Sequence, residues 1–302
     1  MPILTPLSLV VGVLLESIGQ QLLFLVVWLF ALMTFISSMS MKFSDMKVFI
    51  RYPKTILLLI AFLHILMPLW AFTLSSFIFQ DELLIIGFVL SVAVPTGVTS
   101  IIWVTISKGN LPLSLAIVLI DTLLAPIIMP LLIEIVAGQS VQIDTKGLII
   151  DLIWMVVLPS ILGVLLNERT KGKAFTTLNP ILSPISKLCL FAVVMINSSS
   201  IAPFIKNITK ELFIVIVVVL FIALSGYVFA FLLSKFFYNG KHEIRSAFLF
   251  TAGMRNISLG VVIATTYFPS KVAMPVVFGM LFQQILASFA FKINESIKKR
   301  AV

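Results

Sequence analysis

Val94-Pro95-Thr96-Gly97-Val98-Thr99-Ser100 interrupts the apolar run from Leu83 to Ile106, and it decides how this chain can fold. A second polar stretch, residues 251–256 (Thr-Ala-Gly-Met-Arg-Asn), interrupts the apolar run from Ala247 to Phe268 in the same way. In hydrocarbon, an unwound backbone leaves N–H and C=O groups unpaired, so it is tolerated only where protein or a watery cavity surrounds it. A matching pair of such breaks, one in each half of a chain, is typical of the central binding site of a transporter.

The composition indicates a protein dissolved in lipid. Hydrophobic residues make up 60% of the 302 residues and charged residues only 11%, whereas a soluble domain carries about 25% charged residues. The formal net charge of +9 comes from basic residues spread between apolar runs, which favours membrane orientation over a nucleic-acid partner. The single cysteine, Cys189, excludes a disulfide within the chain and argues against a thiolate metal site.

Long apolar runs predict an all-α polytopic membrane protein, because a spanning helix needs about 20 apolar residues. The runs that are long enough are 22–41, 55–79, 83–106, 111–137, 147–166, 181–205, 212–237, 246–268 and 272–293. Residues 3–15 are too short for a secure further span. We therefore expect nine or ten transmembrane helices in a single transporter domain that covers residues 1–302.

Basic residues are divided unequally between alternate loops. One set of loops and the C-terminal tail hold Lys42, Lys47, Arg51, Lys54, Lys108, Arg169, Lys171, Lys173, Lys235, Lys241, Arg245, Lys292, Lys298, Lys299 and Arg300. The opposite set holds Lys146, Lys206, Lys210 and Lys271. The positive-inside rule therefore predicts a cytoplasmic tail, residues 294–302. The two breaks then lie in spans of opposite direction, which favours two inverted repeats, about 1–138 and 147–293.

Ionisable residues at membrane depth are costly and mark candidate functional positions. Asp121 lies in the middle of a span, and Arg255 lies within the second break. Either the two pair across the core, or Arg255 holds an anionic substrate while Asp121 takes a proton; the alternative is a purely structural ion pair. His64, just before Pro68, is either a packing residue or a proton relay, and Lys187 is expected to snorkel from near a span end.

Neutral polar side chains gather at the breaks and near one span end. Four of them, with the freed carbonyls, suit a desolvated monovalent ion or a small polar ligand: Thr96, Thr99, Ser100 and Asn256. The alternative is that these side chains only satisfy backbone groups. Residues 197–200 (Asn-Ser-Ser-Ser) either line a vestibule or form hydrogen bonds between helices.

At these residues the chain resembles the bile acid:sodium symporter family of the bile/arsenite/riboflavin transporter superfamily. The resemblance runs from about Phe24 to the end. Its clearest stretches are residues 41–45, residues 97–130 with Lys108-Gly109-Asn110, and residues 233–256 with Gly253-Met254 and Asn256. The family implies a panel domain, a core domain and two broken helices that cross, with substrate and sodium bound at the crossing.

The departures from the family lie at the implied sodium sites. Where well-studied members carry Glu and Gln in the second break, this chain has Thr251 and Arg255. Elsewhere Asn, Thr and Gln of the family are replaced by Ile101, Val118 and Leu63. Both sites have therefore lost ligands, including the carboxylate that they share. We expect no sodium at either site, because Arg255 would repel it at close range.

These observations lead us to expect a secondary transporter of a small organic anion, bile-acid-like or another carboxylate, in the cell inner membrane. The expected substrate-binding residues are Thr96, Gly97, Thr99, Ser100, Arg255 and Asn256. The ion-site remnants and candidate coupling residues are Ser100, Ser114, Asp121, Thr251, Met254 and His64. We expect transport by alternating access that is sodium-independent or proton-coupled. We expect no cofactor and no nucleic-acid partner, and a monomer would be sufficient for transport.

Other functions remain open. One is an uncoupled facilitator or exporter, like the auxin-carrier-like branch of the superfamily. Another is a membrane receptor on the same fold, although the short linkers leave no room for a soluble output domain. An intramembrane enzyme is the weakest alternative, because the sequence has no His-Glu-x-x-His motif and no catalytic pair of intramembrane aspartates, and Ser100 has no evident base.

Overall fold

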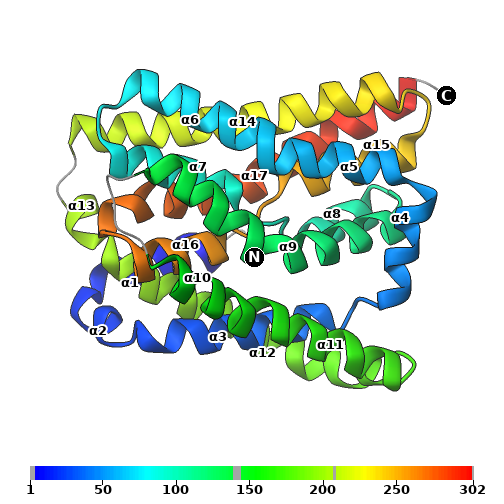
Figure 1. Ribbon diagram of the computed structural model, residues 1–302, viewed down its shortest axis with the longest axis horizontal. Coiled ribbons are helices and arrows are strands. Elements are labelled where there is room, and N and C mark those ends of the chain that lie inside the picture. Colours follow the sequence, from blue (N-terminus) through cyan, green and yellow to red (C-terminus); the bar gives the residue numbers. More distant parts are fainter. Residues whose placement is uncertain (1–3, 139–143, 207–208, 301–302) are drawn as a thin grey trace.

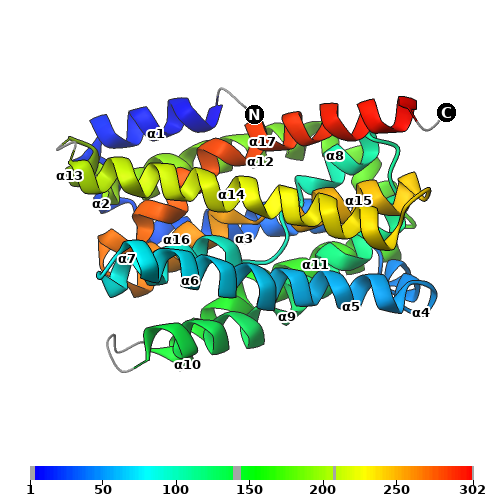
Figure 2. The same cartoon turned by 90° about the horizontal axis from the view of Figure 1, so that it is seen from above.

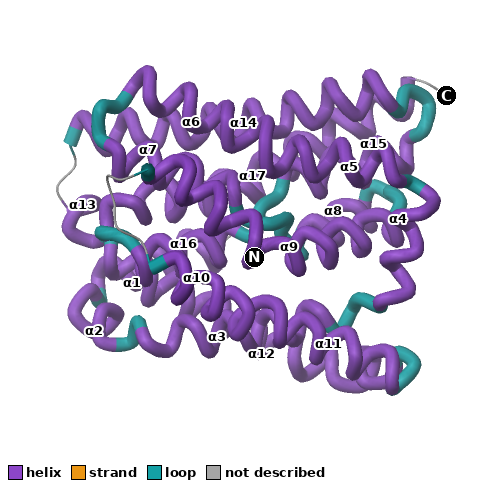
Figure 3. The backbone as a smooth tube through the Cα atoms, viewed as in Figure 1, coloured by secondary structure: helices purple, strands orange, loops and turns teal. Residues whose placement is uncertain are grey.

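The chain folds into a bundle of helices that run mostly along one axis (Figures 1 and 3). The computed structural model describes residues 4–138, 144–206 and 209–300, and these ranges contain no strand. The first part of the chain forms α1 (Leu4–Leu14), α2 (Glu16–Gln21), α3 (Phe24–Ser38), η1 (Phe43–Lys47), α4 (Val48–Arg51), α5 (Pro53–Ala61), η2 (Phe62–Leu66), α6 (Met67–Ile78), α7 (Glu82–Ala93), α8 (Ser100–Ile106) and α9 (Leu111–Ala137). The rest forms α10 (Thr145–Leu152), η3 (Ile153–Val157), α11 (Leu158–Arg169), α12 (Lys173–Ser200), α13 (Ala202–Lys206), α14 (Lys210–Phe237), α15 (His242–Gly253), α16 (Ile257–Tyr267), η4 (Ser270–Val272) and α17 (Ala273–Arg300).

Six continuous helices in the described ranges are long and apolar enough to cross a membrane, which supports the predicted multi-pass membrane protein. They are Pro53–Ile78, Leu111–Ala137, Thr145–Arg169, Lys173–Ser200, Lys210–Phe237 and Ser270–Ile297. A bent pair, Phe24–Ser38 with Phe43–Arg51, adds a seventh if it is taken as one span. The predicted spans 83–106 and 246–268 do not pass this test, because a break divides each into two shorter helices.

Both predicted breaks are present, and each is shorter than the polar stretch that predicts it. The first break is residues 94–99, between α7 and α8, and the second is residues 254–256, between α15 and α16. Val94 is extended (φ −60°, ψ 147°) because the proline that follows disfavours the helical conformation. Ser100 and Thr251 are helical, so the expectation that they belong to the unwound segments is wrong.

Two groups of helices lie side by side in the bundle (Figure 1), and the view from above shows that helices of both groups run along the same axis (Figure 2). In the first group, α12 contacts α1, α2 and α3, and α11 packs on α3. In the second group, α14 contacts α15 and α17, while α7 contacts α6 and α17. The groups meet where α12 and α3 contact α16, and where α9 contacts α10 and η3. The second break therefore lies at the boundary between the groups.

The N-terminal apolar segment packs closely on α12. A Cβ atom at Gly12 would lie 2.1 Å from the carbonyl oxygen of Met195, and one at Gly19 would lie 2.5 Å from Cβ of Ser199. Only glycine lets helices approach at this distance. The segment is thus an integral part of the first group, although α1 has only 11 residues.

Two helices widen into π turns at the same distance before a proline. The turn η2 precedes Pro68 and the turn η3 precedes Pro159. Proline lacks an N–H group and its ring crowds the carbonyl four residues earlier, which before Pro68 is that of His64. A π turn accommodates this carbonyl, and such turns are frequent at functional sites. His64 lies in the interior at this turn, with 5% of its surface exposed.

An ionic cluster ties three elements together at one end of the bundle. Lys271 in η4 donates hydrogen bonds to Asp81 at 2.6 Å and to Glu211 of α14 at 2.9 Å. Asp81 also caps α7, because its carboxylate accepts from the backbone N–H groups of Leu83 and Leu84. Burial favours the neutral form of Asp81, but its hydrogen bond to the charged Lys271 opposes this effect and the pKa of Asp81 falls below its ordinary 3.8.

Asp81→Ala is expected to lower the free energy of unfolding by about 0.5–2 kcal/mol, which is the usual contribution of an N-cap. Because the pKa of Asp81 is lowered in the folded protein, this contribution is complete above the ordinary pKa and is lost as the pH falls through the lower folded value. Thermal unfolding of the detergent-solubilised protein at neutral and at strongly acidic pH measures both effects. Glu82→Ala, at an exposed neighbour, is the control, and an equal loss in both variants at neutral pH would contradict the assignment.

Candidate functional site

The two breaks cross and pair with each other through their backbones, as the family resemblance implies. Gly97 N–H donates to the carbonyl of Met254 at 3.0 Å, and Asn256 N–H donates to the carbonyl of Pro95 at 2.7 Å. An antiparallel bridge lies between these bonds. The bonds satisfy main-chain groups that the unwound helices leave open, at a depth where water is scarce. The crossing is therefore a fixed point of the fold.

Asp121 on α9 accepts a hydrogen bond from the backbone of the first break. Its Oδ2 accepts the backbone N–H of Thr96 at 2.6 Å, and its Oδ1 lies 2.5 Å from Nε2 of His64. The hydroxyl of Thr96 donates to the carbonyl of Thr251 at 3.1 Å, which adds a second link to α15. Asp121 has no exposed surface. A buried carboxylate needs such donors, because an unpaired charge at this depth is very costly.

Arg255 in the second break is buried without a partner for its guanidinium. Its backbone N–H donates to Oε1 of Gln283 at 2.8 Å, and only 6% of the residue is exposed. Among the described residues, Nη1 and Nη2 have no hydrogen-bond partner. The direct Arg255–Asp121 ion pair considered from the sequence does not form, because Asp121 contacts His64 instead. The guanidinium acts electrostatically on Asp121 and on Tyr227 of α14 without an ion-pair contact.

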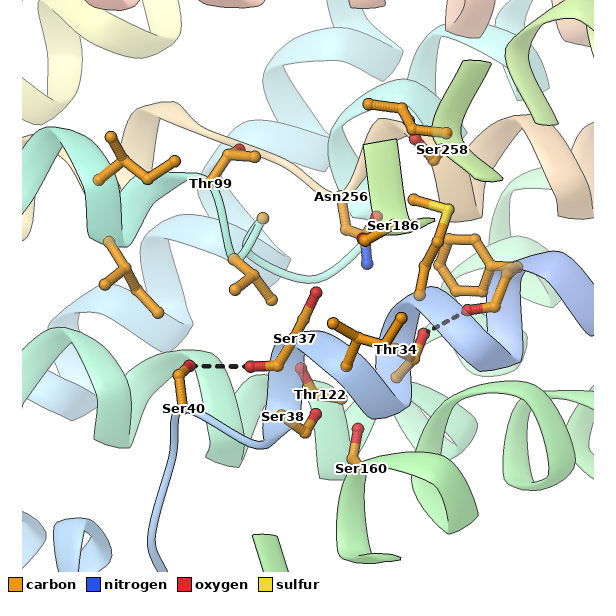
Figure 4. A pocket seen from close by; sticks show the side chains of 18 of the residues that line it. Thr34, Ser37, Ser38, Ser40, Thr99, Thr122, Ser160, Ser186, Asn256 and Ser258 are labelled. Atoms are coloured by element: carbon orange, nitrogen blue, oxygen red, sulfur yellow. Dashed lines mark hydrogen bonds between the residues drawn. The ribbon is translucent and has the colours of Figure 1, made fainter. Parts of the chain in front are cut away.

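A cavity of about 370 Å³ lies beside the crossing, between the two groups of helices (Figure 4). On one side it is lined by α3, α11 and α12, and on the other by the breaks, α8, α9, α16 and α17. Its polar wall consists mainly of hydroxyl and amide side chains: Thr34, Ser37, Ser38, Ser40, Thr99, Thr122, Ser160, Asn179, Ser183, Ser186, Asn256, Ser258, Gln283 and Gln284. The charged residues on the described wall are Lys187 and Arg255, and no acidic residue lines it. The lining therefore suits an anion.

The structure divides the residues that were expected to bind substrate. Four of them line the cavity: Gly97, Thr99, Arg255 and Asn256. Thr96 and Ser100 do not, because they are buried behind the crossing with 1% and 0% of their surface exposed. Asn256 precedes α16 but its side chain does not cap the helix, so the amide is available to the cavity. Figure 4 shows Asn256 and Thr99 with the serines that face them.

The remaining predicted residues lie around the crossing rather than on the cavity wall. The Ser114 hydroxyl donates to the carbonyl of Asn110, the N-cap residue of α9, and the Thr251 hydroxyl donates to that of Ala247 within α15. Met254 is fully buried, and its backbone carbonyl accepts the hydrogen bond from Gly97 at the crossing. The Ser100 hydroxyl is buried without a partner among the described residues. Within these residues, no group of three or more His, Cys, Asp or Glu side chains is placed to hold a metal ion.

The first group of helices contributes cavity residues that the sequence reasoning missed. Lys187 lies in the middle of α12 and lines the cavity, rather than at a helix end as expected from the sequence. On α12 the lining residues recur at helical spacing: Phe175, Asn179, Ser183, Ser186, Lys187 and Leu190. Four of these residues, Asn179, Ser183, Ser186 and Lys187, are polar, and a polar stripe at this spacing is a signal of a polar-facing surface. It could have been found from the sequence.

Residues 197–200 lie outside the cavity wall. Asn197 and Ser198 are buried on α12, and Oδ1 of Asn197 accepts a hydrogen bond from the Thr265 hydroxyl of α16 at 3.3 Å. Ser199 bonds to the carbonyl of Ile196 on its own helix. In this structure the cluster therefore connects helices, as one of the two sequence interpretations had it.

A bundle of apolar helices in which two broken helices cross beside a cavity that carries hydroxyl, amide and cationic side chains is typical of a membrane carrier. The chain belongs to the SBF-like CPA transporter family, whose model matches residues 7–299. This match supports the resemblance to the bile acid:sodium symporter family.

Individual relatives extend the comparison. The chain is 47% identical over 296 residues to "Uncharacterized protein YbaS" of Bacillus subtilis (strain 168), which covers 97% of this chain and 96% of that protein. It is 26% identical over 266 residues to the "Uncharacterized sodium-dependent transporter YocS" of the same organism, covering 87% and 80% of the two chains. It is 28% identical over 256 residues to the "Probable sodium/metabolite cotransporter BASS1, chloroplastic" of Arabidopsis thaliana, covering 83% and 61%.

Gly97→Ala is expected to destabilise the crossing. A Cβ atom at this position would lie 2.7 Å from the carbonyl oxygen of Arg255, and the backbone on both sides of that carbonyl is fixed by the hydrogen bonds of the crossing. Overpacking of this kind costs about 1–3 kcal/mol. The matched control is Gly279→Ala on α17, where the nearest atom is at the ordinary distance of 3.5 Å. Thermal unfolding in detergent compares the two, and equal midpoints would contradict the tight crossing.

Proposed function

We propose that this protein is a secondary carrier that moves a small organic anion by alternating access. The observation that supports this most is the cavity wall, which has Lys187 and Arg255, many hydroxyl and amide groups, and no acidic residue in its described part. A carboxylate in the cavity would gain hydrogen bonds from Asn256 and the serines together with the charge of Lys187. Arg255 would contribute through its field, because its guanidinium is buried behind the wall.

We propose further that the chain crosses the membrane ten times in two inverted halves. In this arrangement α7 with α8 and α15 with α16 are equivalent broken spans, and α1 with α2 forms the first crossing. The helices of the first group, with α10, would form the panel domain and the second group the core domain. The distribution of basic residues supports a cytoplasmic C-terminus in the cell membrane.

The position of the cavity supports an inward-facing conformation. On α12 the lining residues run from Phe175, two residues after Lys173, to Leu190, and on the α3 side they extend to Met41, next to Lys42. Both ends belong to the basic, cytoplasmic set of loops. In this state the cavity would exchange substrate with the cytoplasm, and the outer halves of α12 and α16 would close the other side.

The substrate is proposed to be a carboxylate of modest size. A cavity of about 370 Å³ is near the lower end of the usual range for small-molecule sites, about 300–1,000 Å³. The exposed surface of the wall is mostly apolar, with Phe30 and Phe175 among its residues, which favours a carboxylate with an apolar body. The hydroxyl and amide groups would bind its polar end. The Arabidopsis relative is named a probable sodium/metabolite cotransporter, and a metabolite of this kind is compatible with that name.

Transport is proposed to be independent of sodium, although the names of two relatives mention that ion. In this chain Arg255 stands where the family resemblance places a sodium-binding glutamine, and Thr251 stands where it places the shared carboxylate. The buried guanidinium of Arg255 acts on Asp121, as a bound cation would. A positive charge that is part of the chain would replace one coupling ion, which leaves a proton as the coupling species.

Lys187→Gln is expected to raise the half-saturating concentration of a transported carboxylate about tenfold. A charge-assisted hydrogen bond is worth about 1.5 kcal/mol, and about 1.4 kcal/mol corresponds to a factor of ten. Uptake of radiolabelled carboxylates into proteoliposomes measures the change. The control is Lys173→Gln, at an exposed position of the same helix outside the cavity wall, and Lys187→Arg should restore uptake. Unchanged uptake by Lys187→Gln would remove this residue from the site.

Sodium dependence is tested with the same proteoliposomes. Counterflow by the unchanged protein is expected to be equal in sodium and in potassium, and Arg255→Gln is expected to lower it strongly because Asp121 loses its counter-charge. Strong sodium dependence that survives Arg255→Gln would overturn the proposed role of Arg255. Counterflow that depends on neither sodium nor pH would instead indicate an uncoupled facilitator.

A further inference from the structure

His64 and Asp121 form a buried pair that is separate from the cavity wall. Nε2 of His64 lies 2.5 Å from Oδ1 of Asp121, and the two side chains are 5% and 0% exposed. A contact of this length requires one proton between the two atoms. The other imidazole nitrogen, Nδ1, is buried and has no hydrogen-bond partner in the described part of the chain. A further proton would therefore bind at Nδ1, and Asp121 would remain the acceptor of Nε2–H.

The net charge of this region depends on that proton. The guanidinium of Arg255 is positive and acts electrostatically on Asp121. While His64 is neutral, the charges of Arg255 and Asp121 cancel. A proton at Nδ1 makes His64 an imidazolium and leaves one net positive charge beside the crossing. An anion in the neighbouring cavity would then lie next to an uncompensated positive charge.

The other titratable groups near the pair are not placed to bind and release a proton beside the crossing in the same way. Tyr227 on α14 acts on Arg255. The remaining charged or titratable residues of the elements in contact with η2 and α9 lie toward the ends of their helices: Asp45, Lys47, Arg51, Lys54, Glu82, Glu134, Lys146, Asp151, His242, Glu243 and Arg245. The pair is thus the imidazole–carboxylate contact at the level of the crossing.

Asp121 connects this pair to the cavity on two sides. Its Oδ2 accepts the N–H of Thr96, and the next residue, Gly97, lines the cavity. On α9, Thr122 follows Asp121 and also lines the cavity. A proton at His64 therefore changes the charge on one side of the first break, and a ligand in the cavity lies on the other side of it.

We propose that the His64–Asp121 pair is the proton-binding site of the carrier, and that a proton at His64 and an organic anion in the cavity favour each other's binding. This inference rests on the proposed function, because it needs an anion in the cavity. Coupling between two binding sites is reciprocal. If the proton increases the affinity for the anion, the anion increases the affinity for the proton by the same factor.

The coupling is tested by proton uptake on ligand addition. Pyruvate, lactate, glycerate and taurocholate are each added to the purified protein in weakly buffered solution that contains a pH-sensitive dye. When an anion binds, each protein molecule is expected to take up as much as one proton from solution. The affinity for the anion should rise about tenfold for each unit by which the pH falls within the titrating range. His64→Gln and Asp121→Asn should abolish the uptake and the pH dependence. The control is His242→Gln, which changes the other of the two histidines.

A second measurement needs neither ligand nor variant activity. The chain has two histidines, so ring signals of protein labelled with carbon-13 histidine can be assigned by comparison with His242→Gln. The signal of His64 is expected to titrate reversibly in lipid nanodiscs. If it does so but none of the four anions binds, the proposed function is wrong and the proton site stands. If an anion binds without proton uptake and His64 does not respond to pH, the proton site is wrong and the proposed function stands.

Discussion

The backbone pairing between the two breaks is the constraint on which the rest of this structure depends. Unwound segments within a membrane must find partners for their main-chain groups, and here each break supplies partners for the other. The close approach requires a glycine at position 97. The N–H of Thr96 is not part of this pairing and donates a hydrogen bond to Asp121, whose other carboxylate oxygen contacts His64. The π turn before Pro68 accommodates that histidine. One requirement thus leads to the next across four elements.

The charges at the crossing differ from those implied by the family resemblance. A threonine stands at the position of the shared carboxylate, and Arg255 brings a positive charge that no described side chain pairs. The buried guanidinium is tolerated because Asp121 lies within electrostatic reach. The same scaffold therefore presents a cavity whose described wall has cationic residues and no acidic one. This difference lies in a few side chains and leaves the helix framework intact.

The breaks could be predicted from the sequence because glycine and polar residues within an apolar run have a local meaning. One end of each break was placed too far outward, because Ser100 and Thr251 are helical. A polar residue does not by itself unwind a helix, since its hydroxyl can bond to a carbonyl of the same helix, as that of Thr251 does. The partner of Asp121 could not be predicted, because it depends on which helices face each other and on the π turn that carries His64. Lys187 was placed near a helix end for a different reason: the span was predicted at 181–205, whereas α12 begins at Lys173. That shift turned a mid-helix residue into a terminal one.

The guanidinium of Arg255 is attached to the chain, and this has a consequence for the energetics of a transport cycle. A bound ion enters from one side of the membrane and leaves on the other, so its concentration gradient can perform work. A tethered charge cannot be released on either side, and it is present on the outward and the return stroke alike. It can balance the charge of a cargo, but it contributes no driving force. Any uphill step must draw its energy from a species that exchanges with water.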